Sequence, residues 1–358
     1  MLALNTTAIG WVIFAVITLG WTAYSILNNL SARRELGSEI EMAPNRRSNL
    51  DDETLEGPRL ERLQILGVLL LITMVIGLPL YWVLEPDRQA GAVADIDGRF
   101  RWWGEELFQT TANGGFNCSG CHGGMAATGG VAAYTITDVR TGEVKSVNWY
   151  APALDTVFYR YSKEEVRFIL NYGRPFSPMS AWGAPGGGPM TTQNIETLLV
   201  YLRDIQQPPE GCLTETSFST TADPSVCEGG TLPAATQEEI QLSVDNYLAN
   251  NPGATEGEAL FNLDLAGGAY SCARCHTQGW SYGDPGVSGQ GAFGWNLTGG
   301  SVNSHFPNEA DMISFIESGS SDGKKYGEQA QGTGRMPGFG HMLTGDQIKS
   351  IVEYVRSL

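Results

Sequence analysis

Histidine is scarce in this sequence, and its scarcity excludes several redox functions. The 358 residues include only four histidines, His122, His276, His305 and His341, and none lies in a long apolar segment. A haem held by two intramembrane histidines is therefore excluded, and with it the role of a cytochrome b. Each closely spaced cysteine pair has only one histidine beside it, which argues against a dinuclear copper centre. The chain is thus not the catalytic core of a haem–copper oxidase.

Charge is also sparse, and basic charge most of all. Charged residues make up 17% of the chain, and 22 Lys and Arg stand against 39 Asp and Glu, for a net charge of −17. So acidic a chain is not a partner for nucleic acid. The acidic surface can steer a basic protein partner, or it can serve solubility alone. No glycine-rich loop is placed to cradle phosphate, because the glycine run at 186–188 follows Pro185 and not a strand.

Two pentapeptides carry the strongest chemical signal. They are Cys118-Ser-Gly-Cys121-His122 and Cys272-Ala-Arg-Cys275-His276. This pattern predicts a c-type haem at each, because two thiols bond the haem vinyl groups and the next histidine becomes an iron ligand. The alternative is a single structural zinc site built from both cysteine pairs. That alternative does not explain why a histidine follows each pair.

A methionine in a later loop of each half is the candidate sixth ligand, because a thioether suits a low-spin iron that transfers electrons. In the first half this is Met179, with Met190 as the competitor. In the second half it is Met336, with Met342, His341 and His305 as competitors. Similar lengths of chain separate histidine and methionine in the two halves, which indicates an internal repeat.

Two remaining cysteines, Cys212 and Cys227, lie in a polar stretch rich in Thr, Ser, Gly and Pro. A disulfide between them would close a short loop and stabilise it by about 3 kcal/mol. It would also require an oxidising compartment, as the attachment of haem c does. The alternative is two free thiols.

Two segments, 8–30 and 63–84, are apolar and long enough to cross a membrane. A cleaved signal peptide is the alternative for the first, although it lacks a basic start and an Ala-x-Ala site. The loop between the segments contains six arginines, and positive residues remain on the cytoplasmic side. We therefore expect a two-pass protein of the bacterial cell membrane, with everything after residue 85 on the extracytoplasmic side.

Apolar periodicity predicts the elements around the motifs. Gly104 lies on one face of a helix before the first motif, where Leu198, Tyr201 and Leu202 could pack. A hairpin is expected at Tyr134–Val147, with its turn at 139–142. Further helices are expected at 163–172, 191–206, 236–249, 308–318 and 344–357.

Both halves after residue 95 resemble class I cytochrome c domains. The residues that carry the resemblance are Gly104, Phe108, Cys118–His122, Pro152, Leu154, Met179 and Tyr201, then Gly257, Phe261, Cys272–His276, Leu297, Met336 and Tyr354. In that family the carbonyl of a loop proline accepts the free N–H of the haem histidine, a role that the resemblance gives to Pro152. The second half has Trp295 where proline is expected, so the resemblance leaves that contact open.

Two apolar segments followed by two haem domains are similar to the dihaem subunit of C-type haem–copper oxidases. The tandem haems are also similar to those of the dihaem subunit of actinobacterial quinol–cytochrome c reductases, which has its anchor after the haems. These resemblances imply cytochrome b and oxidase subunits, or a small soluble electron carrier, as protein partners.

The sequence therefore predicts a mainly α protein with two N-terminal transmembrane helices, two class I cytochrome c domains and two covalently bound haems c. Its expected role is to relay single electrons between a quinol-oxidising bc complex and a terminal oxidase, without catalytic residues of its own. Alternatives are the cytochrome subunit of a membrane dehydrogenase, or a dihaem peroxidase, which needs an open iron position. The predicted divisions are 1–30, 31–62 and 63–84 for the membrane part, then 85–206 (first haem domain), 207–253 (linker) and 254–358 (second haem domain).

Overall fold

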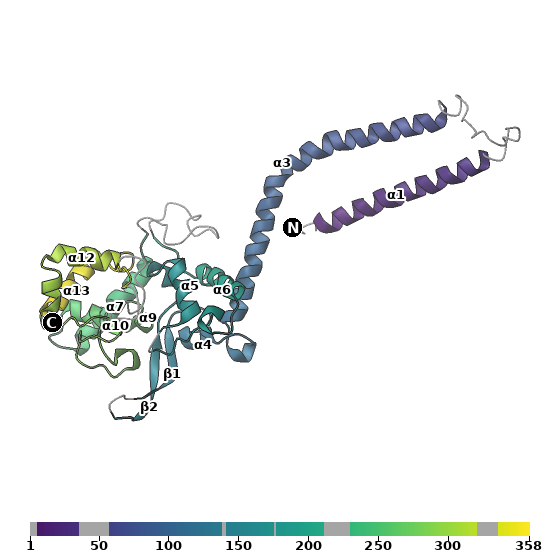
Figure 1. Ribbon diagram of the computed structural model, residues 1–358. Helices are drawn as coiled ribbons and strands as arrows, with labels where there is room; N and C mark the ends of the chain where they lie inside the picture. The colour runs from purple at the N-terminus through teal and green to yellow at the C-terminus, as the bar shows by residue number, and fades with distance from the viewer. Residues whose placement is uncertain (1–5, 36–56, 138–140, 175–176, 211–229, 321–335) are drawn as a thin grey trace. The chain divides into compact units, whose positions relative to one another are not determined.

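The computed structural model describes residues 6–35, 57–137, 141–174, 177–210, 230–320 and 336–358. The chain divides into two compact units, Met1–Pro86 and Asp87–Leu358, and each is described by itself. The described residues are mostly helical, which confirms the predicted mainly α class (Figure 1). The predicted disulfide partners, Cys212 and Cys227, lie outside the described residues.

The first unit contains helix α1 (Thr6–Glu35) and the first part of helix α3 (Pro58–Phe108). Within the described residues, Leu60–Phe108 is the helix long and apolar enough to cross a membrane, and it contains the predicted segment 63–84. Nearly all large apolar side chains of this segment are exposed, as they are at Val16, Ile17 and Leu19 of α1. A crossing by segment 8–30 and the side on which the second unit lies stay predictions.

Helix α3 is longer than the sequence suggested. The apolar segment and the helix before the first motif were expected as separate elements, but α3 runs through Pro79 and Pro86 to Phe108 without interruption. Proline removes one helical N–H but does not end a helix whose neighbours support it. Beyond Pro86, an Asp95–Arg99 ion pair of 2.7 Å at i,i+4 spacing adds local support.

The second unit has two halves, which we define as residues 87–210 and 230–358. The first half contains α4 (Cys118–His122), strands β1 (Gly130–Thr137) and β2 (Val144–Ala151), α5 (Lys163–Tyr172) and α6 (Thr192–Asp204). Three 3₁₀ turns complete it, at Thr111–Asn113, Val157–Tyr159 and Ala184–Gly186. The strands pair antiparallel with Tyr134 opposite Val147, which confirms the predicted hairpin.

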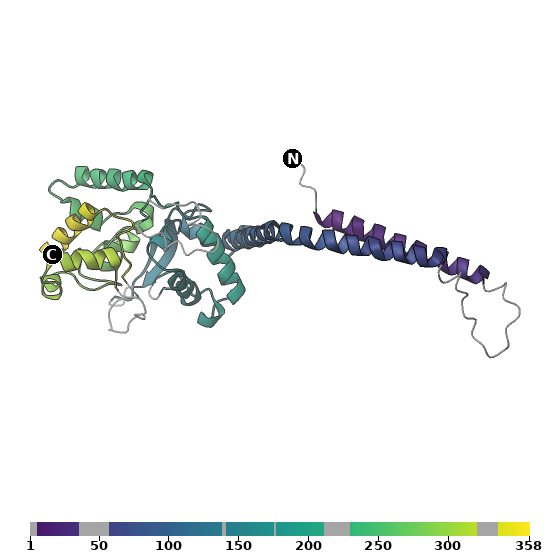
Figure 2. The same ribbon diagram turned by 90° about the horizontal axis from the view of Figure 1, so that it is seen from above.

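The second half is helical. Its α-helices are α7 (Ala234–Asn250), α8 (Glu256–Phe261), α9 (Leu265–Gly268), α10 (Ala273–His276), α11 (Ser301–His305), α12 (Glu309–Ser318) and α13 (Gly345–Ser357), with a 3₁₀ turn at Trp280–Tyr282. Figures 1 and 2 show α12 and α13 side by side, and the hairpin next to α4. The predicted helix positions are confirmed to within about two residues.

Side-chain caps explain where three of these helices begin. Ser162 before α5, Thr191 before α6 and Thr344 before α13 each accept the backbone N–H of the third helical residue. The third residue's side chain accepts the cap's own N–H in return, so each helix starts with a reciprocal capping box.

One close helix crossing occurs in each half. A Cβ atom on Gly104 of α3 would lie 2.6 Å from the Cβ of Tyr201 on α6, so only glycine allows this approach. Gly257 of α8 meets Ser350 and Tyr354 of α13 in the same way. An aromatic pair accompanies each crossing, with ring centroids 5.2 Å apart for Phe108–Tyr201 and 5.4 Å for Phe261–Tyr354. The sequence repeat is thus a repeat of packing.

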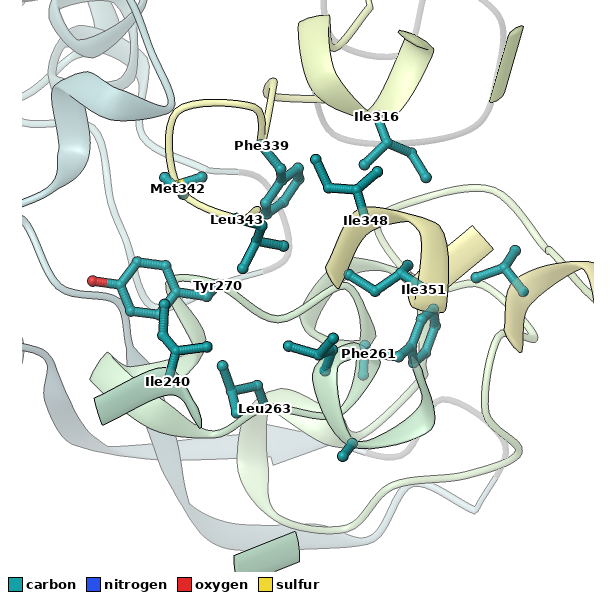
Figure 3. Packing of buried hydrophobic residues seen from close by; sticks show 14 of the residues in the cluster. Ile240, Phe261, Leu263, Tyr270, Ile316, Phe339, Met342, Leu343, Ile348 and Ile351 are labelled. Atoms are coloured by element: carbon teal, nitrogen blue, oxygen red, sulfur yellow. The ribbon is translucent and has the colours of Figure 1, made fainter. Parts of the chain in front are cut away.

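Each half has its own hydrophobic core. The core of the first half includes Leu198, Tyr201 and Leu202, as the helix pattern predicted. The core of the second half gathers side chains from α7, α8, α12 and α13 (Figure 3). Helix α7 falls in the stretch expected as a linker, yet its Ile240 and Val244 are fully buried in this core. The described part of that stretch is therefore largely a piece of the second half.

The α3–α6 crossing predicts the effect of a single methyl group. Gly104→Ala should destabilise the fold by about 1–3 kcal/mol, because the new Cβ would collide with the backbone of Thr197 and with Tyr201. Gly98→Ala on the same helix is the matched control. It meets no atom within 4 Å and should stabilise the helix by about 0.5–1 kcal/mol. Unfolding of the detergent-solubilised chain, followed by circular dichroism, measures both, and equal effects would contradict the crossing.

Candidate cofactor site

A cavity of about 790 Å³ lies in the second unit and is lined by residues of both halves. We call it the shared cavity. Both motif histidines, His122 and His276, line it, and so do both candidate ligands Met179 and Met336. In each half, about 60 positions of chain separate the histidine from the candidate methionine, and the structure places both at the same cavity.

The ring of His122 is fixed by the backbone of Pro152. Its Nδ1 lies 2.8 Å from the Pro152 carbonyl oxygen, the contact that the resemblance implies. A carbonyl only accepts, so Nδ1 donates its proton and Nε2 remains as the metal-binding nitrogen. Such a bond to the far nitrogen orients an imidazole ligand and raises its basicity.

His276 makes the equivalent contact in the second half. Its Nδ1 lies 2.7 Å from the carbonyl oxygen of Trp295, the residue that stands in place of the expected proline. The contact survives the change because a backbone carbonyl belongs to every residue. The neighbouring Gly294 makes it possible, since a Cβ there would lie 2.7 Å from Cε1 of the His276 ring.

Burial keeps both imidazoles neutral. It lowers the pKa of His122 to about 4, partly offset by the hydrogen bond to Pro152, and the nearby charges of Arg274 and Arg160 lower it further. Burial likewise lowers the pKa of His276, although the hydrogen bond to Trp295 partly offsets this by raising it. Neutral imidazole is the form that binds a metal.

The four motif cysteines are free thiols, and burial raises the pKa of Cys118 and of Cys272 to about 12. Among the described residues, which include all four thiols, no group of three or more His, Cys, Asp or Glu is close enough to hold a metal ion. The two cysteine pairs therefore do not form the tetrahedral zinc site considered above.

The competing methionine ligands are distinguished by position. Met179 lines the shared cavity, whereas Met190 is fully buried in the core of the first half and does not line it. In the second half Met336 lines the cavity and Met342 is fully buried in the core. The geometry favours Met179 and Met336.

The two other histidines, His341 and His305, also differ in whether they line the shared cavity. Nδ1 of His341 lies 2.8 Å from the carbonyl oxygen of Gly230, and its ring does not line the shared cavity. His305 does line it, so it remains an alternative to Met336 by position.

The lining of the cavity fits a haem in each half. Each half contributes one neutral imidazole and one thioether to the lining. The second half adds the thiols of Cys272 and Cys275, whereas Cys118 and Cys121 lie in α4 beside His122 and do not line the cavity. The walls between them are mostly apolar and include Leu154, Val157, Leu170, Phe306 and Ile316. An apolar cradle with one nitrogen and one sulfur donor suits a low-spin haem iron.

Three arginines, Arg160, Arg174 and Arg274, also line the cavity, and the sequence pattern gave no reason to select them. Arg160 donates to the carbonyls of Ala153 and Ala269, and burial lowers its pKa. Burial lowers the pKa of Arg274 to about 10. The guanidinium of Arg174 lies 5.1 Å from the centroid of the Tyr161 ring. The one feature of the sequence that could have drawn attention to any of these arginines is that Arg274 lies inside the second motif.

No protein-family model, curated protein or solved structure matches this chain. The case for its function therefore depends on the geometry of the shared cavity.

The position of Gly294 makes a testable prediction. Gly294→Ala should displace the His276 ring and break its bond to Trp295, because the added Cβ would overlap the imidazole. In protein labelled with ¹⁵N-histidine, the protected Nδ1–H resonance of His276 should disappear while that of His122 remains. Gly286→Ala is the control, because its Cβ would meet only the Gln278 carbonyl at an ordinary 3.5 Å. Retention of both resonances in Gly294→Ala would contradict the placement of His276.

Proposed function

We propose that this chain is a membrane-tethered dihaem cytochrome c that relays single electrons. The observation that carries the proposal is the repeated arrangement in the shared cavity. In each half, a histidine with its Nδ1 held by a carbonyl and a methionine from a distant loop line the same apolar space. Haem, when bound, supplies a one-electron change at iron.

The residues of this chain determine what such a site does. Cys118 and Cys121, and likewise Cys272 and Cys275, would hold the haem covalently through its vinyl groups. His122 with Met179, and His276 with Met336, would bind the iron from this chain, so that no substrate needs to bind there. The mostly apolar walls would limit the water around a bound haem, so that the surroundings would rearrange little when its charge changes. This chemistry suits electron transfer better than catalysis.

The packing of the two halves supports a relay through one body. Both candidate sites open into one cavity within a single compact unit. An electron could therefore pass between the two centres without a movement of one domain toward the other. This is a tighter arrangement than two domains joined by a free linker.

The proposed setting is the bacterial cell membrane. Segments 8–30 and 63–84 would cross it, with the arginine-rich loop in the cytoplasm and the second unit on the outer side, where haem c is attached. The partners would be subunits of a respiratory complex, such as cytochrome b or a haem–copper oxidase, or a small soluble carrier. The net charge of −17 favours a basic carrier.

Reduction potentials test the methionine ligands. Met179→Ala should leave the haem covalently attached but lower the potential of one centre, because a thioether ligand favours ferrous iron. Met336→Ala should lower the potential of the other. Met190→Ala is the matched control: it removes a core side chain, destabilises the fold by about 2–5 kcal/mol and leaves both potentials in place. A redox titration in which only Met190→Ala moved a potential would contradict this assignment.

Binding of carbon monoxide tests the relay against catalysis. The reduced protein should show no large spectral change with carbon monoxide, because a histidine and a methionine of this chain would both bind each iron. A large shift in one haem would mean an open iron and would favour a dihaem peroxidase. The same experiment on Met336→Ala serves as a positive control, since that variant should open one position.

A further inference from the structure

The two halves meet at the segment that holds His122. This segment, 150–153, contains Pro152, whose carbonyl oxygen accepts from the His122 ring. Its Ala153 N–H donates to the carbonyl of Ala266 in the second half, over 2.9 Å. The backbone that orients the first motif histidine is therefore built partly by the second half of the chain.

Arg274 makes the most specific of these contacts. It belongs to the second motif, but its Nη1 donates to Tyr150 O at 3.1 Å and to Gly267 O at 2.7 Å. Tyr150 lies two residues before Pro152 in the segment that holds His122. One guanidinium nitrogen thus joins the first half's histidine support to the turn that precedes the second motif.

Arg160 makes the reciprocal contact from the first half. It donates to Ala153 O on its own side and to Ala269 O in the second half, the latter at 3.4 Å. Pro152 is thereby flanked by two carbonyls, those of Tyr150 and Ala153, that each accept from a different arginine. Both arginines also line the shared cavity.

We propose that Arg274 is a positioning residue of the first haem site, although it lies in the second attachment motif. Its Nη1 contact with Tyr150 fixes the segment that presents the Pro152 carbonyl, and its charge lies on the wall of the cavity that His122 also lines. The inference depends on the proposed function, because it concerns a haem attached at Cys118 and Cys121.

The positive charge has a definite consequence for that haem. Reduction adds one electron to the iron, and a fixed cation nearby favours the reduced state, more strongly where water is excluded. Arg274 should therefore raise the reduction potential of the first haem. The two haem sites would then be coupled through a side chain, since any change that moves the second motif also moves this charge.

The chain offers a matched control for the loss of a cation between the halves. Lys145 of β2 pairs with Asp284 of the second half at 2.8 Å. Both side chains are more than half exposed, at 54% and 65%, and neither lines the shared cavity. Solvent screens such a pair, so its loss should leave both potentials unchanged.

The test is a redox titration of the full chain in detergent, with the first haem identified as the one whose potential Met336→Ala leaves in place. Arg274→Gln should lower the potential of the first haem at least as far as that of the second. Arg274→Lys keeps the positive charge but lacks the guanidinium group. It should restore most of the reduction potential of the first haem. Lys145→Gln should shift neither.

An unchanged or raised potential of the first haem in Arg274→Gln would overturn the inference, and so would a shift confined to the second haem. If Arg274→Gln fails to mature, mass spectrometry of the two motif peptides shows which motif has lost its haem. The inference expects haem loss at Cys118–Cys121, and loss at Cys272–Cys275 alone overturns it. A parent protein without covalent haem would instead refute the proposed function itself.

Discussion

The hydrogen bond between a backbone carbonyl and Nδ1 of each motif histidine is the constraint on which the rest of the site depends. It fixes the tautomer, the orientation and the basicity of both imidazoles at once. Pro152 supplies the carbonyl in the first half and Trp295 in the second. The local backbone allows this contact, because Gly294 leaves room for the His276 ring and helix α4 ends at His122.

The two halves of the second unit repeat the same packing, and they also pack against each other. Each has a glycine-mediated helix crossing with an aromatic pair and its own core. Between them lie the hairpin aromatics, with Trp149 5.4 Å from the Tyr282 ring, and the arginine contacts around Pro152. A shared cavity follows from this packing. Two separately folded domains would have allowed the distance between their sites to vary, whereas one body holds it fixed.

Much of this structure could be predicted from the sequence because it depends on local signals. Apolar spacing placed α5 and α13, both of which begin at a local capping box, and the motif spacing selected the cavity's histidines and methionines. The failures concern contacts between distant segments. Periodicity did not indicate that α3 would continue through Pro86. It did predict the apolar face of α7, but not that this helix would belong to the core of the second half and not to a linker. Nor could it show that Arg274 reaches Tyr150, 124 positions away, because side-chain identity says nothing about which carbonyl lies opposite.

The proposed relay requires that each motif hold a haem through both of its cysteines. Peptide mapping of the purified chain by mass spectrometry tests it most directly. We expect the Cys118–His122 peptide and the Cys272–His276 peptide each to carry one haem, attached by two thioether bonds. Free thiols in either peptide, from cells competent to attach haem c, would contradict it.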